Sequence, residues 1–376
     1  MTMNKKIFIA CPWTPLGGGM FKVADYLIQS QTPEKVNKIN RAQLIPLDTR
    51  GGKHPIFSIF YLTAALTTLL FYRILGQAAG VHVNMAERLS LFRKSTVILF
   101  SRSIGVPVIL HLHAAQLHHF YAQLPSFLKA FTRWTFSKAS KVIVLGETAK
   151  KFVIEDLKVS PSNVEIILNG VPEPTYPRAP YSATHNKTRV MFLGNLSERK
   201  GVSDLLNAIA KSQAFQDGKA EAVFVGAENI ELYCNKAEQL GISNMVQFTG
   251  WANQEQVAQW MATTDILALP SYDEGLPLVI LEALSNKVAV LCTPVGEIPH
   301  NLKSDVDSVF VSPGNIEEIT QALDKLILDQ TYREYIAAKG RELYEKGFSL
   351  DRFSNSVAEV HQRVFGASAR PNVSKG

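Results

Sequence analysis

Cysteine is scarce in this chain of 376 residues, which contains only Cys11, Cys234 and Cys292 and no CxxC pair. This pattern excludes a zinc ribbon and a disulfide framework, and it is typical of a reducing compartment. Glycine and proline are near ordinary usage, so collagen-like and proline-rich chains are excluded. With 46% hydrophobic and 19% charged residues, the chain can bury a core. Its length suggests two or three domains, and the early apolar run 7–11 is too short for a signal peptide.

Acidic residues are few in the first half of the chain. Residues 1–180 hold 21 Lys and Arg against 9 Asp and Glu, whereas residues 181–376 hold 18 against 24. The halves therefore carry net charges of +12 and −6, which predicts two domains with different partners. The basic half suits an anionic membrane, a phosphorylated substrate or nucleic acid, although an ordinary soluble surface explains it equally well.

Long hydrophobic runs are also rare. Residues 54–72 contain no formally charged residue, but four Ser and Thr side chains interrupt them. A spanning helix needs ~20 predominantly apolar residues, so we expect a buried or half-buried helix of a domain instead. An interfacial helix at a membrane surface is the alternative, because five Phe and Tyr side chains in the run suit a headgroup boundary.

Short β-branched runs alternate with helical patterns along the chain. We predict strands at 6–11, 43–47, 81–84, 106–111, 141–145, 164–168, 189–193, 222–225, 246–249, 266–270, 288–292 and 308–311. This rhythm indicates parallel sheets with right-handed crossovers. We expect two doubly wound α/β domains, at 1–175 and 188–349, with a proline-rich linker at 176–187 and a ligand in a cleft between them. The pattern is helical from residue 316, and the helix at about 350–367 is expected to pack back on the first domain.

A glycine-rich loop at residues 15–20 separates the first strand from the helix expected at 21–29. Its three glycines, which include Gly17 and Gly18, would let backbone amides approach an anion or a sugar closely. The dinucleotide fingerprint GxGxxG lacks its third glycine here, although Asp48 ends the next strand, where a ribose-binding acid would lie. An NAD site therefore stays open as one interpretation, beside a tight turn without a ligand.

The segment 270–282 (PSYDEGLPLVILE) carries the strongest signal, since it runs from a strand through a polar loop into a helix. Pro277 suits the first helical position, which leaves the amides of Leu278 and Val279 to bind an anion with the helix dipole. Glu274 and Glu282 would flank that anion, so we expect them to hold hydroxyl groups of a sugar and a ribose. A helix cap and a solvated face are the alternative interpretations.

Two more loops follow strands in the same way. Residues 194–201 contain Arg199 and Lys200, which place positive charge where a diphosphate would need it. Residues 294–299 form a third loop, with Gly296 and Glu297. The three loops 194–201, 271–277 and 294–299 should therefore converge at one edge of the second sheet, where a nucleotide diphosphate would fit.

Several of these elements together resemble glycosyltransferase family 4. They are the E-x7-E element from Glu274 to Glu282, the FLG…KG element at 192–201 and the NGV element at 169–171. The resemblance covers nearly the whole chain, and it implies retaining enzymes of the GT-B fold that use nucleotide-sugar donors. Longer strings in the basic half, such as PWTPLGGGMFKVADYLIQSQ and LHLHAAQLHHFY, resemble the α-mannosyltransferases of xanthan and acetan assembly in bacteria.

That closer resemblance implies transfer of mannose from GDP-mannose to cellobiose carried on a polyprenyl diphosphate, during exopolysaccharide assembly. It also implies a peripheral enzyme on the cytoplasmic face of the inner membrane, with an anionic membrane surface as partner and no nucleic acid. Carried over to this sequence, it places Glu274 and His113 beside the donor sugar, Glu282 on the ribose and Lys200 on the diphosphate.

Further donor contacts are implied for residues of the glycine loops and of the helix start, namely Gly17, Gly18, Gly194, Arg199, Gly275, Leu276 and Leu278. Two positions depart from the family pattern. Asn195 stands where many members have Arg, for which Arg199 is a candidate replacement, and Gly146 stands where many have Ser.

No metal or other cofactor is predicted. The histidines at 111, 113, 118 and 119 have no nearby carboxylate or cysteine in sequence, and we expect only His113 to be functional. Asp305 and Asp307 match a DxD pattern, but we interpret them as structural loop residues. Three alternatives remain open: a family 4 enzyme with another nucleotide-hexose and lipid-linked glycan, an NAD-dependent oxidoreductase, and a binding protein without catalysis.

Overall fold

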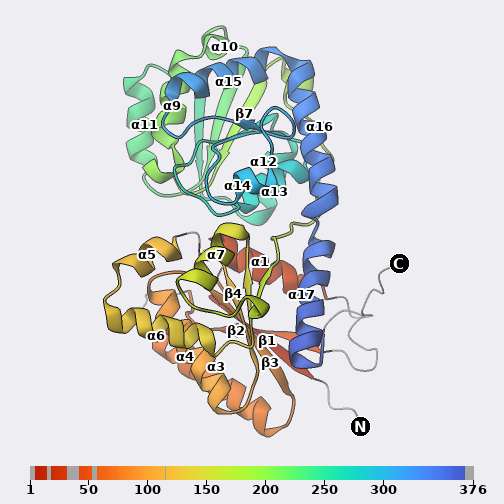
Figure 1. Cartoon of the computed structure of the whole chain (residues 1–376). Coiled ribbons are helices and arrows are strands. Elements are labelled where there is room, and N and C mark those ends of the chain that lie inside the picture. The colour runs from red at the N-terminus through yellow and green to blue at the C-terminus, as the bar shows by residue number, and fades with distance from the viewer. Residues whose placement is uncertain (1–4, 15–17, 32–41, 53–56, 115, 369–376) are drawn as a thin grey trace. The chain divides into compact units, whose positions relative to one another are not determined.

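A computed structural model describes residues 5–14, 18–31, 42–52, 57–114 and 116–368 (Figure 1). The chain divides into two compact units. The first contains residues 1–170 together with 350–376, and the second contains residues 171–349. The C-terminal segment thus belongs to the first unit, and the boundary lies a few residues before the expected position of 175.

A six-stranded, all-parallel sheet organises the first unit, in the order β2-β1-β3-β4-β5-β6. Its strands are β1 (Lys6–Cys11), β2 (Gln43–Asp48), β3 (Ala78–Met85), β4 (Val108–Leu112), β5 (Lys141–Val144) and β6 (Val164–Ile166). All six predicted strands of this unit are confirmed, with small shifts at their ends. The strand order reverses between β1 and β3, and such a switch point is where open α/β sheets bind ligands.

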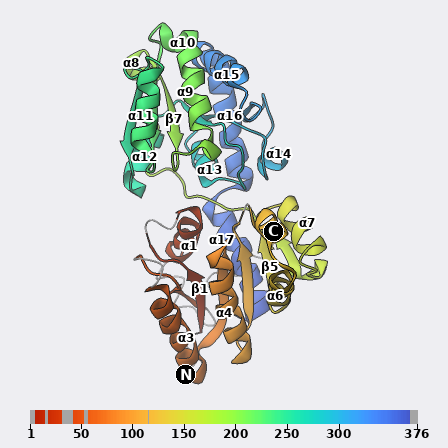
Figure 2. The same ribbon diagram turned by 90° about the vertical axis from the view of Figure 1, so that its left-hand side faces the viewer.

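Helices cover both faces of this sheet (Figure 2). They are α1 (Gly18–Gln29), α3 (Ser58–Ile74), α4 (Leu89–Ser103), α5 (Leu117–Gln123), α6 (Ser126–Ser137), α7 (Glu147–Glu155) and α17 (Leu350–Phe365), with a 3-10 turn η2 (Pro161–Asn163). Helix α17 returns to this sheet so closely that a Cβ on Gly80 of β3 would lie 2.3 Å from the Phe365 ring. Gly80 therefore lets the C-terminal helix seat on the central strand.

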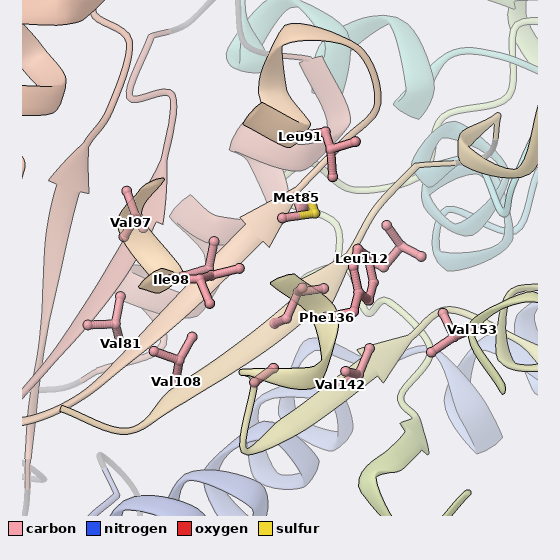
Figure 3. Packing of buried hydrophobic residues seen from close by; sticks show 14 of the residues in the cluster. Val81, Met85, Leu91, Val97, Ile98, Val108, Leu112, Phe136, Val142 and Val153 are labelled. Atoms are coloured by element: carbon pink, nitrogen blue, oxygen red, sulfur yellow. The ribbon is translucent and has the colours of Figure 1, made fainter. Parts of the chain in front are cut away.

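The core of the first unit lies between the sheet and the helices α3, α4 and α6. Figure 3 shows Val81 and Met85 from β3 beside Val97 and Ile98 from α4, with Phe136 of α6 nearby. All five side chains are fully buried. The alternation along β3 sends Val81 and Val83 to this face and the intervening His82 to the other, where α17 packs.

Helix α3 confirms the half-buried helix predicted within 54–72, although residues 53–56 lie outside the described chain. Ala65 and Leu69 are buried, and Leu62, Leu66 and Tyr72 pack partly against the core. Phe60 and Ile74 are 69% and 75% exposed. One side of the helix therefore packs on the core, whereas apolar side chains on its other side are exposed. None of the described helices is long and apolar enough to cross a membrane.

The second unit repeats the architecture around a parallel sheet of order β12-β11-β10-β7-β8-β9. Its strands are β7 (Thr188–Leu193), β8 (Ala220–Val225), β9 (Val246–Gly250), β10 (Ile266–Leu269), β11 (Ala289–Cys292) and β12 (Val309–Phe310), which confirms the other six predicted strands. The order reverses between β7 and β10. The two loops that follow these strands therefore meet at the switch point of this sheet.

The helices of the second unit flank its sheet (Figure 1). They are α8 (Ser182–His185), α9 (Val202–Lys211), α10 (Gln213–Gln216), α11 (Ile230–Gln239), α12 (Gln254–Ala262), α13 (Leu278–Ser285), α14 (Ile298–Asn301), α15 (Ile316–Leu328) and α16 (Gln330–Gly347), with a 3-10 turn η3 (Glu198–Lys200). The helical run predicted from residue 316 is confirmed as α15, α16 and α17.

The predicted linker 176–187 is wrong, because these residues pack on the second unit. Arg178 donates from Nη1 to the carbonyl oxygens of Ala262 and Thr264, and Ser182 Oγ donates to Asp265 Oδ1 at 2.8 Å. Asp265 also accepts from the backbone amide of Arg189 at 2.9 Å. This proline-rich segment is therefore held against the surface of the second unit by hydrogen bonds and is not a free linker.

Candidate active site

The loops after β7 and β10 bring Lys200 and Glu274 into contact at the switch point of the second sheet. Lys200 Nζ forms an ion pair with Glu274 Oε1. The two side chains are only 13% and 10% exposed, so this pair is far less screened than a surface pair. Among the described residues, Glu274 is the one hydrogen-bond or ion-pair partner of the Lys200 ammonium, which carries three N–H donors.

Arg199 contacts the Glu274 loop on its more exposed side. Its Nη1 donates to the carbonyl oxygen of Asp273 at 2.6 Å and lies 3.8 Å from Glu274 Oε1. The Arg199 carbonyl accepts from the backbone amide of Tyr272 at 2.8 Å, and the Tyr272 hydroxyl donates to Asp204 at 2.9 Å. The two loops are therefore fixed to each other by both backbone and side chains.

Two glycines make this convergence sterically feasible. Gly201 has φ +71°, and a Cβ there would lie 2.1 Å from the carbonyl oxygen of Pro270. Gly296, on the third loop, has φ +58°, and its Cβ would lie 1.8 Å from the carbonyl oxygen of Glu274. The Glu297 amide also donates to the Gly275 carbonyl at 3.1 Å. The predicted convergence of the three loops is thus confirmed.

Helix α13 begins at Leu278, one residue later than expected. Pro277 has φ −69° and ψ 133°, so it is the N-cap residue and not the first helical residue. The first amides of any helix lack intrahelical acceptors, and those of Leu278 and Val279 lie at the end of the loop that carries Glu274. All eight residues of α13 are buried, Glu282 included, which rules out the solvated face for that carboxylate.

The loop after β7 is held by the neighbouring strand. The amide of Gly194 donates to the Val225 carbonyl at 3.0 Å, and Gly194 adopts φ +147°. A Cβ on Gly226 would lie 1.9 Å from the Gly194 carbonyl oxygen, so this approach requires two glycines. Asn195, where many family members have Arg, donates from Nδ2 to Glu228 at 2.8 Å.

His113 lies in the first unit, directly after β4, and Asn84 of β3 fixes its ring. His113 Nε2 donates to Asn84 Oδ1 at 2.7 Å, which leaves Nδ1 as the acceptor of a neutral imidazole. Burial lowers the pKa of His113 to about 3, so the ring is neutral at ordinary pH. Gly18 opens helix α1 with φ +64° and is exposed, whereas Gly17 lies outside the described residues.

Three further histidines form a buried chain behind His113. His361 Nε2 and His82 Nδ1 are 2.8 Å apart, and His82 Nε2 and His111 Nδ1 are 3.1 Å apart. The His111 ring lies against His113 with centroids 4.0 Å apart and the ring planes tilted by 38°, and His111 Nε2 is buried without a hydrogen-bond partner. Burial lowers the pKa of His82 to about 3 and the pKa values of His111 and His361 well below their usual range.

The other predicted polar candidates have structural roles. Asp305 accepts from the Tyr332 hydroxyl, and Asp307 accepts from the Lys303 amide at 2.8 Å. Asp48 accepts from the amides of Trp13, Arg50 and Gly51, so a loop and not a ribose occupies its oxygens. The part of the chain that the structure describes contains no group of three or more His, Cys, Asp or Glu side chains arranged to hold a metal.

Sequence reasoning missed Asn84 and the His82–His361 contact. Asn84 is 29 residues from His113, and His361 is 279 residues from His82. No local pattern reports a contact across such separations. The alternation of β3 did carry a weak signal, since His82 and Asn84 are polar residues spaced by two in an otherwise apolar strand.

Comparison with known proteins identifies the same two halves. Residues 178–343 match the family of glycosyl transferases group 1, and residues 41–173 match glycosyltransferase family 4. The chain is similar to the uncharacterized glycosyltransferase MJ1607 of Methanocaldococcus jannaschii, with 23% identity over 68% of this chain and 69% of that protein. It is also similar to the putative teichuronic acid biosynthesis glycosyltransferase TuaC of Bacillus subtilis, with 25% identity over 70% and 66%.

Two other relatives bear on the sugar and the product. The amylovoran biosynthesis glycosyltransferase AmsK of Erwinia amylovora is 22% identical over 76% of this chain and 68% of that protein. A GDP-mannose-dependent phosphatidylinositol monomannoside mannosyltransferase of Mycobacterium tuberculosis is 25% identical over 45% and 46%.

Solved structures match nearly the whole chain. Sucrose-phosphate synthase from Thermosynechococcus elongatus gives a TM-score of 0.76 at 17% identity, covering 97% of this chain and all of that one. Anabaena HepE in complex with UDP-glucose gives 0.74 at 18%, covering 96% and 100%. These matches show the fold, and the family matches exclude the alternative of an NAD-dependent oxidoreductase. The chain therefore belongs to the glycosyltransferases of the GT-B fold, with a family 4 domain in its first half and a group 1 domain in its second.

Proposed function

We propose that this glycosyltransferase moves mannose, with retention, from GDP-mannose to cellobiose carried on a polyprenyl diphosphate, in exopolysaccharide assembly. The strings around residues 12–31 and 110–121 support this acceptor, since they resemble the mannosyltransferases of xanthan and acetan assembly. The names of the mycobacterial relative and of the amylovoran enzyme agree with the sugar and with the kind of product.

The observation that carries the proposal is the ion pair of Lys200 with Glu274 at the switch point of the second unit. In the proposed reaction Lys200 and Arg199 stabilise the charge that develops on the departing diphosphate. The amide of Leu278 and the dipole of α13 act on the same phosphate oxygens. Glu274 holds hydroxyl groups of the mannose, and the buried carboxylate of Glu282 holds the ribose. Gly194, Gly275 and Leu276 supply close backbone contacts to the donor.

Retention does not require Glu274 as a nucleophile. A covalent route needs an unencumbered carboxylate on the face of the sugar opposite the leaving group. Glu274 Oε1 is paired with Lys200 and approached by Arg199, which stabilises the carboxylate charge and makes attack on carbon unfavourable. A front-face route follows, in which an oxygen of the leaving phosphate accepts the proton of the acceptor hydroxyl as the new bond forms. No metal is needed in this proposal, because Lys200 and Arg199 carry the compensating charge.

A lipid-linked acceptor requires a surface that meets the bilayer. Helix α3 presents Ile59, Phe60, Phe71 and Ile74, each more than half exposed, with Arg73 in its last turn. Exposed apolar side chains on a basic half suit peripheral binding to an anionic leaflet. We therefore assign the protein to the cytoplasmic face of the inner membrane, and the interfacial helix is the interpretation that α3 now supports.

The test is transfer of radiolabelled mannose from GDP-mannose to cellobiosyl-diphosphopolyprenol, with labelled UDP-glucose run in parallel. Label in the lipid fraction from GDP-mannose alone supports the proposal. Label from UDP-glucose alone assigns the protein to the alternative, a family 4 enzyme with another donor. The Glu274→Gln variant should lose at least 100-fold in kcat, as removal of a charged transition-state contact does. Glu317→Gln is the matched control, because Glu317 is an exposed glutamate of the same unit that also pairs with a lysine.

A further inference from the structure

The first unit contains a group of cations at the switch point of its own sheet. Lys94 of α4 is fully buried, and its Nζ donates to Thr49 Oγ1 at 2.7 Å. Thr49 follows β2, and the next residue, Arg50, is half-buried. Arg93 precedes Lys94 on α4 and is also half-buried. We call Arg50, Arg93 and Lys94 the basic cluster.

The basic cluster is not neutralised by the described part of the chain. None of its three side chains forms an ion pair with a described carboxylate, and Arg93 Nε is buried without a hydrogen-bond partner. Asp48 is the carboxylate whose charge acts on Arg93 and Lys94. Its oxygens already accept from three backbone amides. Within the described residues, two guanidinium groups and the Lys94 amine, whose pKa burial lowers to about 7, therefore face one carboxylate.

A nearby thiol does not supply the missing negative charge. Cys11 ends β1 and is fully buried, and burial raises the pKa of its thiol to about 11. The thiol is therefore neutral at ordinary pH. Burying a cation without a counter-ion is costly, and Coulomb attraction for an approaching anion is strong in such surroundings because water screens it poorly.

We propose that Arg50 and Arg93 bind a diphosphate group, with Lys94 supplying positive charge beneath them, and that this group is the one that links the acceptor glycan to its lipid. This inference rests on the proposed function for the identity of the acceptor. Two guanidinium groups suit phosphate oxygens, because their planar N–H pairs match the geometry of two oxygens at once. A diphosphate diester carries two negative charges, which complement the two guanidinium groups and favour the protonated form of Lys94.

Recognition of the diphosphate gives the first unit a reason to prefer a lipid-linked glycan over a free one. The terminal sugar of cellobiose is uncharged and offers only hydroxyl groups, which many glycans share. A charged group at a fixed distance from the reacting hydroxyl supplies binding energy and also orients the glycan. The basic cluster thus acts as the anchor of the acceptor, while the donor binds in the second unit.

The first experiment measures binding of inorganic pyrophosphate to the full chain by calorimetry. It uses a Lys200→Met background, so that the cation of the second unit does not contribute. Adding Arg93→Gln or Lys94→Met should weaken binding at least tenfold. Adding Arg102→Gln should change it less than twofold, because Arg102 is an exposed cation of the same helix α4. Absence of binding, or equal weakening by Arg102→Gln, overturns the site.

The second experiment compares two acceptors, phytanyl-diphosphate cellobiose and octyl cellobioside, which lacks phosphate. The wild-type preference, expressed as the ratio of the two kcat/KM values, should fall at least tenfold in Arg50→Gln and Arg93→Gln. Arg102→Gln should keep the ratio. An unchanged ratio, with pyrophosphate binding still lost, overturns the acceptor assignment and gives the site to a free phosphate compound. If the wild type transfers to neither acceptor, the proposed function fails, while pyrophosphate binding still decides the anion site.

Discussion

Acid should unfold the first unit before the second, because the histidine chain of the first unit is buried and neutral. His82, His111 and His361 are at most 1% exposed. His82 lies within hydrogen-bonding distance of both His361 and His111. Their pKa values lie well below the ordinary value of 6.5, and that of His82 is about 3. Between pH 6.5 and 3 the unfolded chain binds protons that the folded unit excludes. Stability therefore falls as the pH decreases through this window.

The magnitude follows from proton linkage. Moving from pH 7.5 to 5.5 stabilises each unfolded histidine by ~1.4 kcal/mol. The three histidines of the chain and His113, whose pKa is also about 3, therefore cost the first unit ~5.5 kcal/mol together. That is a large share of the ~5–15 kcal/mol by which domains are stable. The two histidines described in the second unit, His185 and His300, are exposed, so that unit lacks this contribution.

Urea unfolding at the two pH values measures this difference. Each unit contains two of the four tryptophans, so a Trp251→Phe/Trp260→Phe variant reports fluorescence from the first unit alone. The slope of its unfolding free energy should approach four protons near pH 5, three from the histidine chain and one from His113. His361→Gln should reduce the slope by about one proton, since glutamine keeps a hydrogen-bonding group but does not titrate. A slope below one proton, or one shared equally by the second unit, would refute the reasoning.

Three further predictions concern single positions. Lys94→Met should stabilise the first unit by up to ~5 kcal/mol at pH 7 and by ~2 kcal/mol at pH 9, because burial lowers the pKa of Lys94 from 10.5 to about 7. Chemical unfolding that shows no gain in stability contradicts this. Gly296→Ala should cost ~2–4 kcal/mol of stability and abolish donor binding, since its Cβ would meet the Glu274 carbonyl. Gly218→Ala is the control, because Gly218 also has a positive φ but open space around it, and it should cost ~1 kcal/mol and keep donor affinity. Thermal unfolding and titration with GDP measure the two effects. Asn84→Leu should lower kcat at least tenfold, because it removes the hydrogen bond to His113. Asn84→Asp should keep most of the wild-type kcat and raise the pKa of His113. The acid limb of the pH–rate profile reports that pKa.

Much of the fold could be predicted because it depends on local patterns. A fully buried parallel strand needs a short run of β-branched and other apolar residues, and all twelve runs of this kind are strands. The convergence of three loops in the second unit followed from the same logic, since parallel strands end at one edge. The boundary between units and the packing of residues 178–182 on the second unit depended instead on contacts with Asp265 and Ala262, which proline content does not report.

Helix α3 shows a different limit. Its apolar composition says that its side chains avoid water, but not which neighbours are present to cover them. Ala65 and Leu69 are buried and Leu62, Leu66 and Tyr72 pack partly against the core, but other apolar side chains of the helix are exposed. The buried histidines show the opposite case, in which polar residues of β3, β4 and α17 are covered by long-range packing. Both outcomes are set by tertiary contacts that lie far apart in sequence.

The two switch points differ in how their charges are balanced, and this difference separates two kinds of binding. In the second unit, Lys200 is paired with Glu274, so the folded site is close to neutral before a donor arrives. A diphosphate there can bind Lys200 without leaving Glu274 unsolvated, because the sugar hydroxyls of the same donor replace the ammonium as hydrogen-bond donors. In the first unit, Asp48 is the described carboxylate that faces Arg50, Arg93 and Lys94, and its oxygens are already occupied. An anion there neutralises charge that the fold leaves uncompensated, so its binding should stabilise the first unit more than a donor stabilises the second.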